Sequence, residues 1–291
     1  MTDDMVKLRQ HLTAQASQEP YCCLVLGGAD TGKTMLVNNL ACASAAGKKV
    51  AVIDADIGQS HIGPPTTVGW ALADPAVFEM SALPVREIYF VGDVAPTGRL
   101  LQLTAAINLA SRQALQQAQL VIIDTGGFIN DPAARALWWQ VHRIIVPQVV
   151  VAVQRHDELE PILKGLAQIT PNLFRLGCSP QVRSKSAHRR RQFRRRRFAD
   201  YFRHRQDYML DLADVSLQPA RLRGSADPDN FSNRLVALRD RRGRDRALGI
   251  IVAYHKQNNM LVITSPPITI EEIRCVVMGD VQIDLSTYFN A

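Results

Sequence analysis

The sequence predicts an α/β fold: a P-loop NTPase with a doubly wound, mostly parallel sheet and a basic helical lid, followed by a small C-terminal β-rich domain. Three observations support this prediction. Residues 27–34 read GGADTGKT and fit the phosphate-binding pattern G-x-x-x-x-G-K-[ST]. Apolar strand-like segments then alternate with helix-like segments, which is typical of a parallel sheet covered on both faces. From Leu235 onward, strand-like segments follow one another without helices between them, two joined by a turn at residues 256–259 and two more around a turn at residues 279 and 280.

The phosphate-binding loop lies between the two elements that its function needs. YCCLVL (21–26) predicts a buried strand before it, and MLVNNLACASAA (35–46) predicts a helix after it. Backbone N–H groups at such a helix N-terminus bind anions, while Lys33 would reach the β- and γ-phosphates and the Thr34 hydroxyl would ligate Mg²⁺. A Gly-rich turn can match the pattern by chance, but the strand and the helix argue against it. The residues predicted to hold ATP or another NTP are Gly27, Gly28, Ala29, Asp30, Thr31, Gly32, Lys33, Thr34 and Met35.

Further strands and helices follow in alternation. Val- and Ile-rich runs without polar alternation predict strands that are covered on both faces. Ligands of such sheets bind at the carboxyl ends of the strands. The predicted strands are residues 48–56, 87–92, 119–127 and 148–154, and the predicted helices are residues 100–117, 133–143 and 157–169.

Carboxylates end two of these strands. Asp54 and Asp56 are two residues apart in an extended segment, so their side chains point the same way. One of them can hold Mg²⁺ through water and the other can accept a proton from a hydroxyl nucleophile, although a solvated strand-end pair has the same pattern. Asp124 ends LVIID in the Walker-B arrangement, and DTGG (124–127) fits a D-x-x-G loop that senses a γ-phosphate. The predicted metal ligands are Thr34, Asp54 and Asp124.

Two loops are expected to meet a second substrate. GQSHIGPPTTVG (58–69) is rich in Gly, Pro, Ser and Thr, and it predicts an irregular loop that either closes over a substrate, with Gln59 as a binding residue, or is inert. VAPTGRL (94–100) follows the third strand and leads into a helix whose free N–H groups are able to bind a phosphate. A plain helix-capping turn would have the same sequence. The turn residues are Pro96, Thr97 and Gly98.

The net charge of +7 is placed unevenly along the chain. Residues 183–205 contain eleven Lys and Arg residues and one acid, Asp200, which gives this segment a charge of +10. The rest of the chain has 23 basic and 26 acidic residues, which gives it a charge of −3. A mildly acidic body with one intensely basic segment indicates a polyanionic partner, either nucleic acid or nucleotide phosphates and less readily an anionic lipid.

The basic segment predicts a helix over SAHRRRQFRRRRFADYF (186–202). Mutual repulsion makes such a helix marginal by itself, and bound phosphates would order it, which is how a lid behaves. Phe198 and Phe202 lie on its flank and are able to pack against the body, whereas a solvated basic face is the alternative to a lid. The residues on one narrow stripe of the helical wheel are Arg190, Arg194, Arg197 and Tyr201.

Composition bounds the domain organisation and the class of protein. A chain of 291 residues can hold a core domain and a smaller one, which we place at residues 1–206, with the lid at 183–205, and at residues 207–291. Residues 212–234 are interpreted as a connection. The five scattered cysteines argue against a disulfide framework or a zinc site and for the reducing cytoplasm. The polar N-terminus and the short apolar runs predict neither a signal peptide nor a membrane span, and the sequence leaves the oligomeric state open.

In this order, the motifs resemble those of the polynucleotide 5′-hydroxyl kinase family, whose eukaryotic members include the RNA kinase of the pre-mRNA cleavage complex. The chain is similar to the shorter archaeal and bacterial members, and the resemblance extends from Tyr21 to Leu285. It rests on GGADTGKT, DADIGQSHIGPPTT, VAPTG, DTGGFI and VAVQRHDELEPIL, on the spacing of basic and aromatic residues in the lid, and on GIIVAYHKQNNMLVITSPP near the C-terminus.

The resemblance implies an enzyme that moves the γ-phosphoryl group of ATP to the 5′-hydroxyl end of RNA or DNA, with ATP and Mg²⁺ as cofactors and nucleic acid as partner. The chain departs from the eukaryotic members in two ways: residues 1–20 are too short to form their N-terminal β domain, and Asp124 stands where they often have Asn. The implied roles are Lys33 and Thr34 on ATP and Mg²⁺, Asp56 as general base, Pro96, Thr97 and Gly98 as a clasp near the nucleic-acid end, and Arg190 and Arg194 as lid arginines at the transferring phosphate.

The sequence also leaves room for other classes of protein. The first alternative is a P-loop nucleotide switch, an ATPase or GTPase that regulates a nucleic-acid-processing partner without kinase activity. DADIGQS is similar to the corresponding strand of partition-type ATPases, but Gly28 replaces their additional lysine and the chain has no N-K-x-D guanine motif. A catalytically silent scaffold is the second alternative, and the intact set of Lys33, Thr34, Asp56 and Asp124 argues against it.

Overall fold

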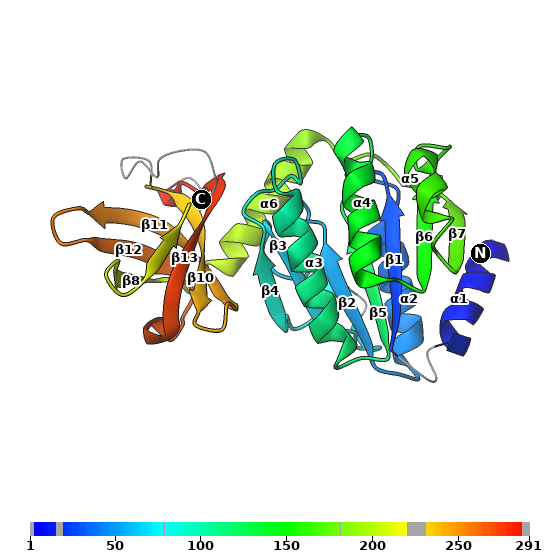
Figure 1. The fold of residues 1–291 in the computed structure, drawn as a ribbon, viewed down its shortest axis with the longest axis horizontal. Helices are drawn as coiled ribbons and strands as arrows, with labels where there is room; N and C mark the ends of the chain where they lie inside the picture. Colours follow the sequence, from blue (N-terminus) through cyan, green and yellow to red (C-terminus); the bar gives the residue numbers. More distant parts are fainter. Residues whose placement is uncertain (1–2, 16–19, 78, 181, 220–230, 287–291) are drawn as a thin grey trace.

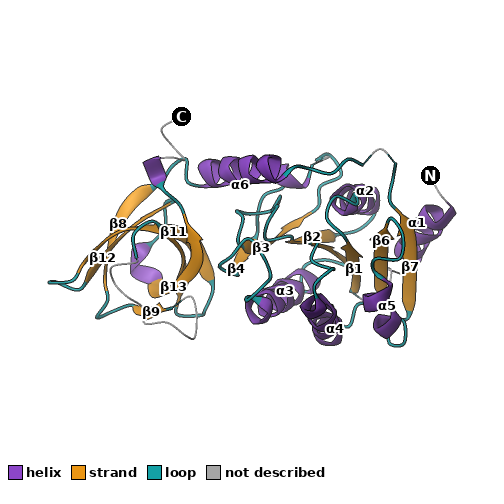
Figure 2. Ribbon diagram, turned by 90° about the horizontal axis from the view of Figure 1, so that it is seen from above, coloured by secondary structure: helices purple, strands orange, loops and turns teal. Residues whose placement is uncertain are grey.

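The computed structural model describes residues 3–15, 20–77, 79–180, 182–219 and 231–286. Within these ranges, a seven-stranded sheet and a six-stranded sheet lie side by side, and helix α6 (Ala187–Tyr201) runs from one to the other (Figure 1). The first sheet has helices on both faces, and the second has none packed as a layer (Figure 2). The predicted α/β fold with a second, β-rich C-terminal sheet is therefore confirmed, and the basic segment forms a helix as predicted, whereas its role as a lid stays a prediction.

The first sheet is mostly parallel, as predicted. Strands β2, β5, β1, β6 and β7 pair in parallel with one another, whereas β3 runs antiparallel to both of its neighbours, β2 and β4. The register places Asp54 directly beside Asp124, so the two predicted metal ligands end neighbouring strands. In spatial order the strands are β4 (Glu87–Phe90), β3 (Thr67–Leu72), β2 (Val50–Ala55), β5 (Leu120–Thr125), β1 (Tyr21–Gly27), β6 (Val149–Gln154) and β7 (Asn172–Gly177).

Helices cover both faces of this sheet, which explains why the central strands are buried along their whole length. Figure 2 shows α2 and α6 on one face, α3, α4 and α5 on the other, and α1 at the β7 edge. Local signals start two helices, because the Asp131 carboxylate caps α4 at Ala133 N–H and the Ser186 hydroxyl caps α6 at Arg189 N–H. The helices are α1 (Asp3–Gln15), α2 (Lys33–Ala45), α3 (Leu100–Leu115), α4 (Pro132–Ile145) and α5 (Glu160–Leu166), with a 3₁₀ turn η1 (Met80–Ala82).

The second sheet begins at Gln206, one residue before the predicted domain boundary. The predicted pair of strands around the turn at residues 256–259 is present as β11 and β12. Part of the interpreted connection is strand β9, and its residues 220–230 lie outside the described residues. In spatial order the strands are β8 (Gln206–Asp211), β12 (Met260–Ser265), β11 (Asp245–His255), β10 (Arg234–Asp240), β13 (Ile273–Gln282) and β9 (Ser216–Gln218), with a 3₁₀ turn η3 (Ile270–Glu272) before β13.

Two sequence interpretations of strands were wrong. Residues 58–69 were expected to be loop throughout, but β3 begins at Thr67, where its residues become buried against β2. A turn was expected at residues 279 and 280, yet β13 continues through them. Gly279 serves close packing and not a turn, since a Cβ there would lie 2.8 Å from the carbonyl oxygen of Gly92.

The two domains are joined by a domain junction, which we define as the contacts of β4 and residues 91–99 with the second sheet and the C-terminal half of α6. Phe198 and Phe202 are buried there between β4 and the second sheet, as predicted. The Asp280 amide donates to the Gly92 carbonyl at 2.7 Å, and the side chains of Arg99 and Asp280 form an ion pair at 2.8 Å. The residues that flank the clasp thus contact the C-terminal domain.

Candidate active site

The phosphate-binding loop connects β1 to α2 at the carboxyl edge of the first sheet. Gly32 caps α2 with a φ of 89°, a left-handed conformation that favours glycine, and Asp30 also has a positive φ of 53°. A Cβ on Gly127 would lie 2.4 Å from the Ala29 nitrogen, so the D-x-x-G loop packs directly against the phosphate-binding loop. The structure therefore brings together the two motifs that flank a γ-phosphate in the sequence prediction.

Lys33 is held inside this loop. Its side chain is buried, and the Nζ atom donates to the Gly28 carbonyl at 2.6 Å. Burial lowers the pKa of Lys33, although the nearby carboxylates of Asp124 and Asp56 act in the opposite direction. The ammonium group is thus poised at the loop with no ion-pair partner in contact among the described residues.

Asp54 and Asp124 form a buried carboxylate pair behind Lys33. Desolvation raises the pKa of each to about 7, and a neighbouring carboxylate adds to the shift in both cases. The oxygens of Asp54 accept the backbone N–H groups of Asp56, His61 and Ile62, so this side chain holds the loop that follows β2. A metal-binding role for Asp54 stays a prediction, and its observed contacts are to the backbone.

Asp124 has the arrangement that a magnesium ligand needs. Both of its oxygens are buried and make no hydrogen bond of normal geometry within the described residues, although the Thr34 hydroxyl lies near enough to lower its pKa. No group of three or more His, Cys, Asp and Glu side chains among these residues could hold a metal alone, which fits an ion that takes most ligands from phosphates and water. Asp124 and Thr34 therefore fit Mg²⁺ bound together with a nucleotide.

Asp56 lies between the phosphate-binding loop and the clasp segment. Its Oδ1 atom accepts the Gly58 and Gln59 N–H groups at 3.1 and 3.0 Å, and the residue is half-buried. A Cβ on Gly126 would lie 3.4 Å from the same oxygen, which places Asp56 against the loop after Asp124. Within the described residues its second carboxylate oxygen accepts no hydrogen bond, and Asp56 lines the cavity above the phosphate-binding loop. This geometry suits a carboxylate that accepts a proton from a hydroxyl group.

The N-terminal half of α6 covers the phosphate-binding loop. The Arg190 guanidinium pairs with the Asp30 carboxylate, and the Lys185 N–H donates to the same carboxylate at 2.9 Å. The Gln59 amide donates to the Arg190 carbonyl at 3.3 Å, so the loop after β2 meets the lid directly. Arg194 lies elsewhere: it lines a second cavity with Val94 and Phe198. The structure separates Arg190 from Arg194, which the sequence had placed on one stripe.

The clasp residues lie at the start of α3, above the domain junction. Pro96 accepts a backbone hydrogen bond from Arg99 at 2.8 Å, and Gly98 has a φ of 80°. The Val94 carbonyl packs against Gly58, where a Cβ would lie 2.7 Å from it. The clasp therefore adjoins the loop that carries Asp56 and Gln59, although within the described residues no hydrogen bond links Thr97 to that loop.

Sequence reasoning missed several residues at this site. The His61 ring packs on Phe193 of the lid at a centroid distance of 5.2 Å. Arg197, which the sequence placed on the lid stripe without a role at the site, donates to the carbonyl oxygens of His61 and Gly63, both at 2.8 Å. Arg155 donates to the Asp30 carbonyl. These contacts depend on how α6 and the loop after β6 cross the sheet, and the sequence signals only that the residues are polar or aromatic.

The main cavity opens above the phosphate-binding loop with a volume of about 470 Å³. It brings residues 29–35 of the predicted nucleotide-binding set together with Asp56, Gln59 and Arg190, and adds His61 and the turn at residues 79–81, whereas Gly27 and Gly28 do not line it. Asp54 and Asp124 lie below it, and the clasp and Arg194 lie outside it. Its lining is suited to a phosphorylated ligand, because it combines free loop N–H groups with Lys33, Lys185 and Arg190.

Comparisons with known proteins agree with this geometry. The family model described as mRNA cleavage and polyadenylation factor CLP1 P-loop matches residues 27–204. A protein of Pyrococcus abyssi named polyribonucleotide 5′-hydroxyl-kinase is 31% identical over 202 residues, which are 69% of this chain and 56% of that protein. A protein of Methanocaldococcus jannaschii with the same name is 30% identical over 200 residues, 68% of this chain and 55% of that protein. The chain thus spans a little more than half the length of these relatives.

A solved structure has the same fold. The Clp1p chain in the wild-type Clp1p–Pcf11p complex matches 96% of this chain and 78% of its own length with a TM-score of 0.72 at 14% identity. The match covers both domains, so their arrangement recurs in that protein. Separately, none of the helices in the described ranges has the length and apolar character needed to cross a bilayer.

Proposed function

The chain belongs to the CLP1 P-loop family, and from this membership we propose that it is an ATP-dependent polynucleotide 5′-hydroxyl kinase. It would transfer the γ-phosphoryl group of ATP to the 5′-hydroxyl end of RNA or DNA. The relatives named polyribonucleotide 5′-hydroxyl-kinase favour RNA as the acceptor. The five free cysteines suit the cytoplasm, which we propose as its location.

The observation that carries the proposal is the position of Asp56. A nucleotide-hydrolysing switch needs only to orient water, whereas a kinase needs a base that an incoming hydroxyl group can reach. Asp56 is half-buried at the cavity wall, and the loop that follows it adjoins the clasp segment through Gly58 and Val94. A 5′-hydroxyl group entering beside the clasp would therefore meet this carboxylate.

The remaining residues either bind the phosphate groups of ATP or act on the attacking hydroxyl group. The loop N–H groups and Lys33 hold the β- and γ-phosphates, and Arg190 exchanges its pairing with Asp30 for the transferring phosphoryl group. Asp124 and Thr34 would hold Mg²⁺, which when bound neutralises charge on the phosphates. Asp56 takes the proton of the attacking hydroxyl as the new P–O bond forms, and ADP leaves with the electron pair of the broken bond.

Incubation of the protein with γ-labelled ATP and 5′-hydroxyl RNA or DNA oligonucleotides tests the proposal. We expect label at the 5′ end of the oligonucleotide, with RNA labelled faster, and almost none with the Lys33→Ala variant, since removing the ammonium typically costs about 3 kcal/mol of transition-state stabilisation or more. The matched control is Lys49→Ala, a lysine exposed on the opposite edge of the sheet. ATP hydrolysis without labelled oligonucleotide would reject the kinase and favour a nucleotide switch.

A further inference from the structure

A second cavity lies on the side of α6 that faces away from the phosphate-binding loop. It has a volume of about 400 Å³ and is bounded by the lid helix, by Val94 beside the clasp and by Val281 of β13. The buried ring of Phe198 forms its floor. We call it the lid groove. Its other lining residues are His188, Arg191, Gln192, Arg194 and Arg195, and none of the lining residues is acidic.

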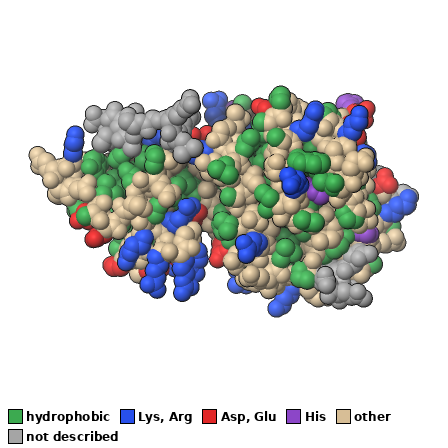
Figure 3. Space-filling model, in the orientation of Figure 1, with side chains coloured by type: hydrophobic (Ala, Val, Ile, Leu, Met, Phe, Trp, Pro, Cys, Tyr) green, Lys and Arg blue, Asp and Glu red, His purple; other side chains and the backbone are tan. Residues whose placement is uncertain are grey.

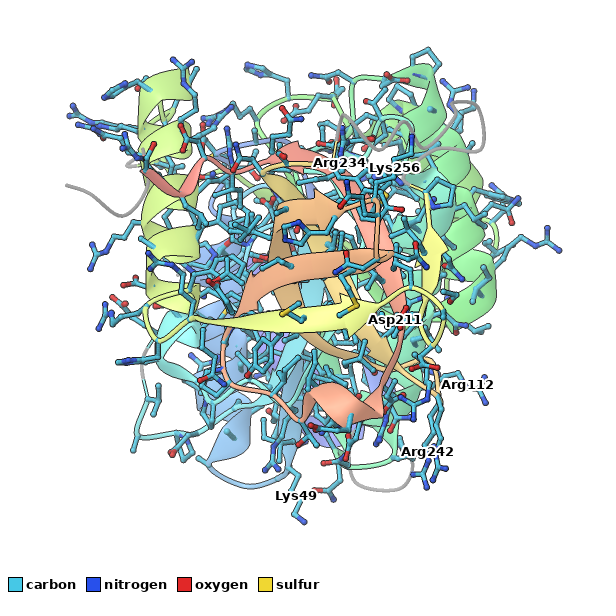
Figure 4. The ribbon with its side chains drawn as sticks, turned by 90° about the vertical axis from the view of Figure 1, so that its left-hand side faces the viewer. Lys49, Arg112, Asp211, Arg234, Arg242 and Lys256 are labelled. Atoms are coloured by element: carbon cyan, nitrogen blue, oxygen red, sulfur yellow. The ribbon has the colours of Figure 1, made fainter. Side chains whose placement is uncertain are left out.

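Helix α6 therefore presents two different basic faces. Arg190, Phe193 and Arg197 face the catalytic loops through contacts with Asp30, His61 and Gly63. Arg191 and Arg195 are four residues apart, so they lie one helical turn from each other on the lid-groove face, about 100° and 140° around the helix from Arg190. Figure 4 shows that basic side chains project into solvent from this helix. One helix thus supplies separate arginines to the catalytic cavity and to the groove.

The lid groove begins where the acceptor would leave the catalytic carboxylate. The Val94 carbonyl touches Gly58, which is two residues from Asp56, and the Val94 side of the clasp forms one end of the groove. A strand whose 5′-hydroxyl group is at Asp56 and whose first nucleotide passes the clasp would enter the groove next. The far wall is Val281, which the domain junction fixes relative to the clasp through Arg99 and Asp280.

The chemistry of the groove selects a polyanion in extended form. Arginines one helical turn apart are able to bind successive phosphates, and the apolar floor accepts part of a base or sugar. The volume of the groove is in the range of small-ligand pockets and is too small for a duplex. We propose that the lid groove binds the nucleotides that follow the 5′-terminal one in a single-stranded acceptor. This inference rests on the proposed function, and it assigns to the C-terminal domain a part in holding the substrate.

A pair of double variants tests the groove. Arg191→Ala with Arg195→Ala removes two charges from the groove face, whereas Arg189→Ala with Arg196→Ala removes two exposed charges from a face of the same helix that lines neither the groove nor the cavity above the phosphate-binding loop. Binding is measured by fluorescence anisotropy without ATP, using a single-stranded 5′-hydroxyl RNA of about a dozen nucleotides, a 5′-hydroxyl dinucleotide and a blunt duplex. Arg241→Ala with Arg242→Ala is a further control, because Arg242 lies at the corner of the C-terminal sheet away from α6 (Figure 4).

We expect the groove variant to bind the long single strand about tenfold more weakly and to lower the salt slope of its binding by about two. Its affinity for the dinucleotide, its kcat on that acceptor and its affinity for the duplex should change by less than about twofold, and both control variants should resemble the unmodified protein. Equal losses in the groove and α6 control variants, or equal losses for dinucleotide and long strand, would overturn the groove. If the unmodified protein bound the long strand with this pattern but transferred no phosphate, the proposed function would fail and the groove would stand.

Discussion

The carboxyl edge of the first sheet and the domain junction both bury charged side chains, but they treat them in opposite ways. At the edge, Asp124 and Lys33 lack ion-pair partners in contact among the described residues, and burial shifts the pKa of each toward its neutral form. At the junction, Arg99 pairs with Asp280 at 2.8 Å. The ion pair at the junction holds the two domains in place. The edge instead holds buried ionisable groups without ion-pair partners, which a bound ligand would supply.

A second ion pair supports the junction from the C-terminal sheet. Arg239 pairs with Asp245 at 2.7 Å, and Asp245 also accepts the Phe90 N–H of β4 at 2.7 Å.

Exposed charge does not distinguish the two regions as clearly as the buried groups do. Figure 3 shows Lys and Arg side chains over both domains, with a gathering at the lower edge of the C-terminal domain. The state of the buried groups, and not the number of exposed ones, therefore distinguishes the carboxyl edge of the first sheet from the junction, and the predictions below test that distinction.

The largest expected effect is on activity at the edge. Asp56→Asn should lower kcat by about 10²–10⁴-fold, because an amide cannot accept the proton of the 5′-hydroxyl group. The free energy of unfolding should change little, since the Asn oxygen can still accept the Gly58 and Gln59 N–H groups. Single-turnover transfer and ATP affinity are measured together. A parallel collapse of ATP affinity would make Asp56 a metal ligand and remove it as the base.

At the junction, the corresponding change should damage stability and spare the chemistry. Asp245→Ala leaves the Arg239 guanidinium and the Phe90 N–H without their shared acceptor, and breaking a buried pair in this way costs about 3 kcal/mol. Urea denaturation measures the loss, with the exposed acid Asp207→Ala as the control in the same sheet. If the variant kept its stability but lost kcat at saturating substrates, the junction would have a catalytic role that we do not assign to it.

Arg190 lies between these two extremes, because its guanidinium pairs with Asp30 but remains about one-third exposed. Arg190→Ala should lower kcat by about 10²-fold if the arginine moves to the transferring phosphate, as expected for the loss of one charged donor in a transition state. Its neighbour Arg189 is exposed and points away from the cavity, so Arg189→Ala is the matched control. Equal kcat values for the two variants would show that Arg190 only stabilises the phosphate-binding loop through its ion pair with Asp30.

The parts of the site that come from strand ends could be predicted from the sequence. A phosphate-binding loop after one buried strand and carboxylates after two others must meet at one edge of a parallel sheet, and Asp54 does lie beside Asp124. The contacts of the lid could not be predicted, because they depend on the angle at which α6 crosses the loop after β2. His61 illustrates this, since only its packing on Phe193 reveals its place.

The predicted strand boundaries were wrong where a residue type occurs both in turns and in strands. Gly279 followed by Asp280 is a common turn signal, but here the glycine allows β13 to approach the Gly92 backbone. In the same way, the Pro- and Thr-rich run at residues 64–67 conceals the start of β3. Both segments lie at or near the domain junction, where long-range contacts and not local propensity decide the conformation.

The last prediction is a dependence of stability on pH to which the two edge carboxylates contribute, together with Asp245 at the junction, whose pKa burial also raises. Desolvation raises the pKa of Asp54 and Asp124 to about 7, while both would titrate near 4 in the unfolded chain. Between these values the folded protein binds more protons than the unfolded one, so its free energy of unfolding falls as pH rises from about 4 to about 7. Lys33 and Asp56 also face Asp124, and the two buried carboxyl groups are expected to titrate as a pair.

Urea denaturation without Mg²⁺ across this pH range measures the slope, and Asp124→Asn should reduce it by removing one of the two groups. Addition of Mg²⁺ with a nucleotide should raise stability most at the upper end of the range, where Asp124 is ionised and able to bind the metal. Asp207→Ala, an exposed acid of the C-terminal sheet, should leave the slope unchanged. A stability that rises between pH 4 and 7 in the unmodified protein would mean that the edge carboxylates are ionised and satisfied, and the contrast between the two regions would be lost.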